Sequence, residues 1–133
     1  GGCKPNPGRK YGSYRVTLNG DEVLRRERFD LGHGTNNEAE FESLEAALEG
    51  TIRGLMAAGL EPRMYEVRVV TDSTILANRV SGKKVKAMGG PAGAEAARRM
   101  AERAERCVAK LRLFAGYEVG WTDREANVLQ FGH

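Results

Sequence analysis

The sequence predicts a mixed α/β domain, with a sheet of about five strands and helices packed on it. Three features predict this class. An alternating hairpin pattern opens the chain over residues 11–31, an amphipathic helix pattern follows, and two short strand patterns with helical segments between them fill the second half. Because a long helix separates the hairpin from the next strand, we expect a parallel crossover onto the same sheet.

Length and composition describe an ordinary globular chain. Its 133 residues, 41% hydrophobic and 29% charged, suit a single domain spanning residues 1–133. Neither an apolar run of ~20 residues nor a signal-peptide pattern is present, so we expect no membrane partner. We also expect a cytoplasmic monomer. Cys3 and Cys107 form no metal-binding spacing and are expected as reduced thiols. The net charge of +3 is compatible with a polyanionic partner without requiring one.

The first strands are expected as an antiparallel hairpin. Lys4 to Gly8 (KPNPG) reads as a tight surface loop, because its prolines exclude helix and central strand. Residues 11–18 alternate as a half-buried strand, with Tyr14, Val16 and Leu18 on one side. Asn19-Gly20 is a hairpin turn signal. The returning strand, about residues 22–31, is expected to place Val23, Phe29 and Leu31 on one face.

A helix is expected from Thr35 to about Gly59, and its start carries an unusual acid. Glu40 lies one turn before Leu44, at the edge of the apolar stripe, where an ionised carboxylate is costly unless a cation or hydrogen bonds meet it. The stripe consists of Phe41, Leu44, Leu48, Ile52 and Leu55.

Two interpretations of Glu40 are open from its own sequence position. It is one of several glutamates on this helix (Glu38, Glu42, Glu45 and Glu49) that favour the positive end of the helix dipole. The residues directly before it favour a functional interpretation instead, because Thr35, Asn36 and Asn37 offer N-cap chemistry and exposed amides beside Glu40.

The second half alternates strands and helices. Residues 64–70 (MYEVRVV) predict a largely buried strand that ends in Thr71-Asp72-Ser73. A short helix over residues 74–80, a basic glycine-rich loop over 81–93, a helix over about 94–113 and a last strand with Tyr117, Val119 and Trp121 alternating are expected next.

The helix over residues 94–113 has an apolar and a basic side. Its apolar stripe is Ala97, Ala101, Ala104, Val108 and Leu111, and its basic side is Arg99, Arg103, Arg106 and Lys110. The spacings of Glu95 with Arg99 and of Glu102 with Arg106 predict i,i+4 ion pairs, so we interpret the basic side as a solvated surface rather than a nucleic-acid groove.

Asp72 closes the predicted central strand. An aspartate before a helix is most often an N-cap, so Asp72 by itself is weak evidence of function. Ligands bind at the carboxyl ends of parallel strands, however, and Glu40 and Asp72 can meet there. Two close carboxylates repel unless a cation neutralises them. Oxygen ligands suit Mg²⁺ or Mn²⁺, and the sequence has no Cys/His cluster typical of zinc. Metal-assisted phosphodiester cleavage suits such a site.

Four segments together resemble the type 1 ribonuclease H family, over nearly the whole chain. They are the opening GGCKPNPG, the helix start TNNEAE, the strand end VVTDS and the segment WTDREAN. The resemblance implies a ribonuclease H-like fold, with a five-stranded mixed sheet, an N-terminal antiparallel hairpin and helices on both faces.

The resemblance also implies an activity and its residues. It implies hydrolysis of the RNA strand of an RNA–DNA hybrid by a two-metal mechanism, with Glu40 and Asp72 as catalytic metal ligands. The substrate contacts that it implies are amides near the 2′-hydroxyls, a hydroxyl near a DNA phosphate and lysines on phosphates. The amides are those of Asn6, Asn36 and Asn37, and the hydroxyl is that of Thr35. The lysines are Lys83, Lys84 and Lys86. Locally, Asn6 can be only a turn residue, and Thr35 or Asn36 only a cap.

The family pattern has two further carboxylates that this sequence does not match. The first would fall immediately before Gly1, so we expect the domain to have residues before Gly1 and possibly after His133. The other falls on Phe131, and neither Asp123 nor His133 fits the motif. Three functions therefore stay open: a hybrid-cleaving endoribonuclease, a hybrid-binding module of the same fold without cleavage, and a DNA-acting nuclease of the wider fold.

Overall fold

The structure of the protein is a computed structural model that describes residues 2–4, 8–18, 21–81 and 90–122. None of its helices, in these ranges, is long and apolar enough to cross a membrane. The elements are β1 (Gly2–Lys4), β2 (Gly8–Leu18), β3 (Asp21–Gly34), α1 (Asn36–Ala57), a 3-10 turn (Pro62–Met64), β4 (Glu66–Thr71), α2 (Thr74–Val80), α3 (Gly90–Leu111) and β5 (Gly116–Trp121).

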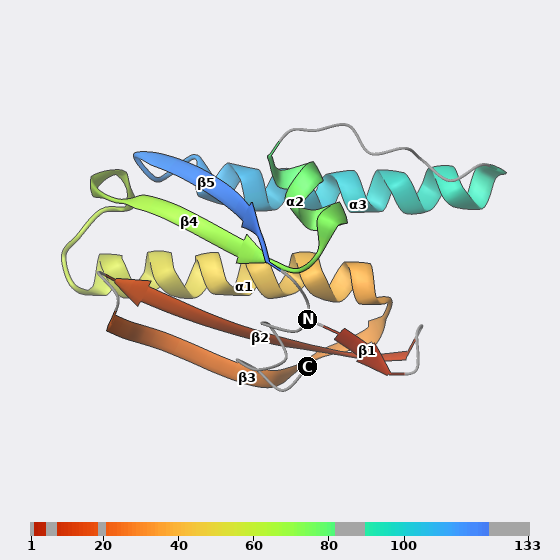
Figure 1. Ribbon diagram of the computed structural model, residues 1–133, viewed down its shortest axis with the longest axis horizontal. Coiled ribbons are helices and arrows are strands. Elements are labelled where there is room, and N and C mark those ends of the chain that lie inside the picture. Colours follow the sequence, from red (N-terminus) through yellow and green to blue (C-terminus); the bar gives the residue numbers. More distant parts are fainter. Residues whose placement is uncertain (1, 5–7, 19–20, 82–89, 123–133) are drawn as a thin grey trace.

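In the described part of the chain, five strands form two sheets, which lie below and above α1 in the view of Figure 1. Strands β1, β2 and β3 pair antiparallel in that order, which confirms the N-terminal hairpin. β4 and β5 pair parallel with each other. The mixed fold and the strand number agree with the prediction. The expected crossover onto the hairpin sheet is wrong for the described residues, because β4 pairs with β5 instead.

Helix α1 is the central element and matches its prediction. Thr35 caps its first turn, and Ala58 ends it before Gly59, whose positive φ of +76° suits glycine. The predicted stripe packs in the core: Phe41 and Leu48 are buried, and Leu44, Ile52 and Leu55 pack against them. The core cluster is completed by buried residues of α2, α3 and the turn after it. These are Leu76, Val80, Ala104, Cys107, Leu111 and Phe114.

The hairpin differs from the prediction at Val23. Val16 lies opposite Leu24, and Thr17 lies opposite Glu22, so a register shift leaves Val23 as the extra residue of a bulge. Val23 is 59% exposed as a result. Leu24 points inward instead and lies close to α1. A Cβ added at Gly50 of that helix would be 3.1 Å from the Leu24 side chain. The alternation read from the sequence assumed a regular strand, and the bulge breaks it.

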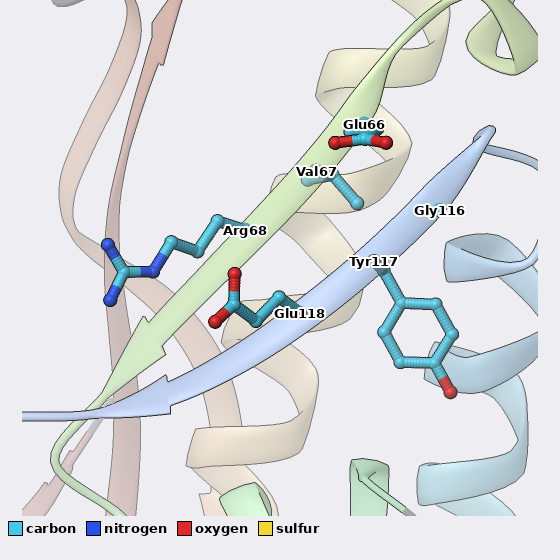
Figure 2. A pocket seen from close by; sticks show the side chains of 6 residues that line it. All are labelled: Glu66, Val67, Arg68, Gly116, Tyr117 and Glu118. Atoms are coloured by element: carbon cyan, nitrogen blue, oxygen red, sulfur yellow. The ribbon is translucent and has the colours of Figure 1, made fainter.

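β4 is half-buried rather than largely buried. Val67 and Val69 pack against the core, whereas Glu66, Arg68 and Val70 are exposed, Val70 by 55%. In Figure 2 the described helices lie behind β4 and β5, on one face of this pair. We expected helices on both faces, and in the described part of the chain only one face is covered. Because the other face is exposed to solvent, buried and exposed residues alternate along β4.

Helix α3 makes more contacts with the core and with α1 than the sequence suggests. It begins one turn earlier than predicted, and the buried Cys107 joins its apolar side. Arg99 pairs with Glu95 as predicted, at 3.5 Å. Arg106 instead lies 3.2 Å from Glu45 of α1. The basic side of α3 therefore faces the acidic side of α1, and its interpretation as a fully solvated surface is wrong.

Candidate active site at the end of β4

Asp72 occupies the turn between β4 and α2, and its neighbour Ser73 does the capping. The Ser73 hydroxyl accepts a hydrogen bond from the Leu76 amide at 3.1 Å, and Ser73 has the extended backbone of an N-cap residue. The interpretation of Asp72 as the cap of α2 is therefore wrong. Its carboxylate is left for another role.

The backbone around Asp72 is held from two strands. The indole nitrogen of Trp121 donates to the Asp72 carbonyl at 3.1 Å, and the Thr122 amide donates to the Thr71 carbonyl at 2.8 Å. The Thr71 hydroxyl accepts from the Ser73 amide at 3.1 Å. Trp121 was not among the predicted site residues. It could have been found from its position at the end of the last predicted strand. β4 and β5 end together, and Thr71 and Trp121 are register partners there.

The Asp72 carboxylate itself is half-buried and has no hydrogen bond or ion pair with any other described residue. A partly desolvated carboxylate without a partner costs free energy, which a cation or external donors would offset. Its position at the carboxyl end of a parallel strand is where ligands bind in open α/β sheets. The arrangement therefore suits an exogenous cation.

Glu40 lies in the second turn of α1 and is also half-buried. At 3.6 residues per turn, it lies within about 60° of both Ser43 and Leu44 around the helix axis. Ser43 packs against β2, because a side chain at Gly12 would collide with it. Leu44 packs against the core cluster that β4 and β5 also contact. Glu40 is therefore on the side of α1 that faces the line between the two sheets.

The elements that carry Glu40 and Asp72 pack together. Phe41, next to Glu40, and Leu76, four residues after Asp72, are buried in one core cluster. Helix α2 contacts α1 directly. The core thus brings the start of α1 and the turn after β4 to the same part of the molecule.

The predicted substrate contacts are only partly described. The Thr35 hydroxyl accepts from the Glu38 amide at 3.3 Å, so Thr35 is the N-cap of α1. Asn36 and Asn37 begin α1 and are half-buried. Four further predicted contacts lie outside the described residues, as do the residues considered for the unmatched carboxylate. The four are Asn6, Lys83, Lys84 and Lys86, and the others are Asp123, Phe131 and His133.

The donor set fits a magnesium-type ion better than zinc. Asp72 and Glu40 supply hard oxygens, and no cluster of three or more His, Cys, Asp or Glu side chains occurs among residues 2–4, 8–18, 21–81 and 90–122. Mg²⁺ is commonly held by one or two carboxylates, with waters and substrate phosphates as its other ligands. Asp72 and Glu40 are therefore of the kind and number of protein ligands that such an ion commonly has.

Two open grooves of the described surface lie away from Glu40 and Asp72. An open groove of about 420 Å³ lies along the first half of β4 and β5, far from the strand tips (Figure 2). Another, of about 450 Å³, lies between α2, α3 and β5. Neither is lined by Glu40 or Asp72.

Comparison with known proteins identifies the fold. No protein-family model matches the sequence, and no curated protein matches it either. The structure is similar to RNase H1 from the archaeon Halobacterium salinarum NRC-1, with 22% identity, a TM-score of 0.67, and 94% of this chain and 82% of the other covered. It is also similar to LC11-RNase H1, isolated from compost by a metagenomic approach, with 24% identity, a TM-score of 0.70 and coverage of 96% and 83%.

The same compost protein has been solved in complex with an RNA/DNA hybrid, and that structure matches with 24% identity, a TM-score of 0.66 and coverage of 96% and 84%. Three structures of this kind, each covered over more than four fifths of its length, show that the chain has the RNase H1 fold. The fold that the resemblance implied is confirmed.

Proposed function

We propose that this chain, which has the RNase H1 fold, is a type 1 ribonuclease H that hydrolyses the RNA strand of RNA–DNA hybrids. The observation that carries the proposal is Asp72, a half-buried carboxylate at the tip of a parallel strand that does not cap the following helix. A structural aspartate at this position would be expected to act as the cap, and Ser73 has that role instead.

In this proposal Asp72 and Glu40 hold divalent metal ions, Mg²⁺ or Mn²⁺, between the turn after β4 and the start of α1. The ions supply activation of water and stabilisation of the leaving oxygen. The protein supplies fixed ligands. Trp121 and Thr71 hold the backbone at Asp72, and the core packing of Phe41 anchors the helix that carries Glu40.

Selection of a hybrid is proposed to come from the amides at the start of α1. Asn36 and Asn37 can both donate to and accept from a 2′-hydroxyl, the group that marks RNA. Asn6 is proposed to add a third amide, and Thr35 to lie beside a DNA phosphate. Contacts of Lys83, Lys84 and Lys86 with phosphates would add affinity without sequence preference, so binding should weaken as salt rises.

The test is a cleavage assay on a labelled RNA–DNA hybrid, with duplex DNA and single-stranded RNA as competing substrates. Wild-type protein is compared with Asp72→Asn and Glu40→Gln, with Mg²⁺, with Mn²⁺ and with a chelator. Glu49→Gln is the matched control, because Glu49 is a glutamate of the same helix far from its start and pairs with Lys110 at 3.7 Å. We expect cleavage of the hybrid alone, its loss in both site variants and with the chelator, and no change in the control.

The other functions make different predictions in the same assay. Salt-sensitive hybrid binding without cleavage in either metal would replace the enzyme with a binding module. Cleavage of duplex DNA at a rate similar to that of the hybrid would identify a DNA-acting nuclease. Equal cleavage by wild-type and Asp72→Asn protein would remove Asp72 from the mechanism.

A further inference from the structure

A partly buried cluster of four charged side chains joins β2, α1 and α3 near the start of α1. Lys10 of β2 has a side chain only 5% exposed, and its Nζ lies 2.9 and 2.7 Å from the two carboxylate oxygens of Glu42 and 3.5 Å from Glu38. Arg103 of α3 reaches the same two acids, at 3.3 Å from Glu38 and 3.1 Å from Glu42. We call these four residues the α1 clamp.

The α1 clamp is balanced in charge and partly shielded from solvent: Lys10 is 5% exposed, and the other three side chains are 22–27% exposed. Two cations meet two carboxylates, so the desolvation cost of each charge is offset by its partners. The backbone passes so near that a Cβ at Gly34 would lie 2.7 Å from a Glu38 oxygen and 2.9 Å from the Lys10 side chain. The Gly34 carbonyl in turn accepts a bond from the Cys3 thiol at 3.0 Å. The clamp therefore also contacts the residue that precedes the helix cap Thr35.

The clamp fixes the rotation of α1 about its own axis. Glu38 and Glu42 are one turn apart on the same side of the helix, and Glu40 lies between them in sequence, about 200° round the axis from each. Holding both flanking acids from two different elements determines the direction in which Glu40 points. A helix held only by its apolar stripe can rotate slightly, because apolar contacts are non-directional.

We propose that Lys10 and Arg103 are positioning residues, which aim Glu40 at the metal site by holding Glu38 and Glu42 on the opposite side of α1. This inference rests on the proposed function, in which Glu40 is a metal ligand. The clamp has a second consequence: Glu38 and Glu42 are neutralised by protein cations, so a divalent ion near the start of α1 is not drawn to them.

The same two helices provide a matched control. Further along α1, Glu45 and Glu49 pair with Lys110 of α3 at 3.8 and 3.7 Å. Lys110 bridges α1 and α3 as Arg103 does, but its partners Glu45 and Glu49 lie further along α1 than Glu38 and Glu42. Removal of Lys110 tests loss of an interhelical ion pair without disturbance of the clamp.

The experiment measures Mn²⁺ binding by titration calorimetry and the Mn²⁺ concentration for half-maximal hybrid cleavage, on the full chain. Lys10→Met is compared with wild type and Lys110→Met, at a temperature where circular dichroism shows all three folded. Glu42→Gln and Arg103→Lys are milder variants for use if Lys10→Met does not fold. We expect Lys10→Met to weaken Mn²⁺ binding and raise the half-maximal concentration at least 5-fold, Lys10→Arg to recover part of this, and Lys110→Met to stay within 2-fold.

The outcomes separate this inference from the proposed function. Unchanged Mn²⁺ affinity in folded Lys10→Met, or an equal loss in Lys110→Met, overturns the positioning role even if the hybrid is cleaved. Wild-type protein that cleaves no hybrid but loses Mn²⁺ affinity on Lys10→Met contradicts the proposed function and supports the clamp. Wild-type protein that binds no Mn²⁺ overturns both.

Discussion

Separate substitutions of two adjacent residues, Asp72 and Ser73, should have different effects: one on activity and the other on stability. Ser73 accepts the hydrogen bond from the Leu76 amide and caps α2. Loss of such a cap costs ~1 kcal/mol of unfolding free energy. We therefore expect Ser73→Ala to lower the free energy of unfolding by about 1 kcal/mol, or roughly 3–5 °C in melting temperature for a domain of this size.

The neighbouring Asp72→Asn variant should behave in the opposite way. Asparagine keeps the size of the side chain and removes a half-buried charge that has no partner among the described residues. The attraction of the helix dipole for that charge, about 0.3–1 kcal/mol, is lost as well. Since these two effects oppose each other, we expect a net change in stability below about 0.5 kcal/mol. Hybrid cleavage, in contrast, should fall below detection in Asp72→Asn and persist within a few-fold in Ser73→Ala.

Two measurements on the same samples check this pair: urea unfolding followed by circular dichroism, and cleavage of a labelled hybrid at a temperature where both variants are folded. Reversed stabilities, with Asp72→Asn less stable than Ser73→Ala, would refute the reasoning, because Asp72 would then be the structural residue. Equal activity loss in the two variants would refute it as well.

Three further predictions concern other parts of the structure. A double-mutant cycle of Lys10→Met and Glu42→Gln should give a coupling energy of about 1–2 kcal/mol in urea unfolding, because Lys10 is buried and bonds both Glu42 oxygens. Burial raises the pKa of the Cys107 thiol from 9.0 to about 12. Between these values the Cys107 thiol of the unfolded chain loses its proton and that of the folded chain keeps it, so the unfolding free energy should fall with rising pH more steeply in wild type than in Cys107→Ala, by up to about 1.4 kcal/mol per pH unit. Trp121→Phe removes the indole bond to the Asp72 carbonyl and should slow hybrid cleavage while costing at most about 1 kcal/mol of stability.

Each of these predictions has a result that contradicts it. Additive effects of the Lys10 and Glu42 variants would mean that the ion pair contributes nothing to stability. An identical pH dependence of unfolding in wild type and Cys107→Ala would show that the thiol titrates normally in the folded protein. Full hybrid cleavage by Trp121→Phe would show that the indole does not position Asp72.

Local signals in the sequence predicted the helices well. The cap at Thr35, the apolar stripe of α1 and the start of α2 after Ser73 are set by residues within one or two turns of each other, so the sequence displays them directly. The position of Asp72 after β4 was predicted for the same reason. Assignment of the cap to Ser73 rather than Asp72 needed backbone geometry, because both residue types are good caps.

Features that depend on partners distant in sequence were not predictable. Val23 is exposed because the pairing of β2 with β3 shifts register, and nothing in β3 alone shows this. Lys10 follows an arginine near the start of a strand and looks like a surface lysine, yet it is buried because acids of α1 lie opposite it. Arg103 was assigned to a solvated side of α3, because the acids of α1 that face it are distant in sequence, Glu38 by 65 residues.

The central claim is that Glu40 and Asp72 together hold a divalent ion. Its most direct test is anomalous diffraction from crystals of this protein soaked in Mn²⁺. The account predicts an anomalous peak between the two side chains, within ligand distance of an oxygen of each, and no peak there in crystals of Asp72→Asn. Carboxylates that point away from each other with no peak between them would contradict it, as would an undiminished peak in the variant.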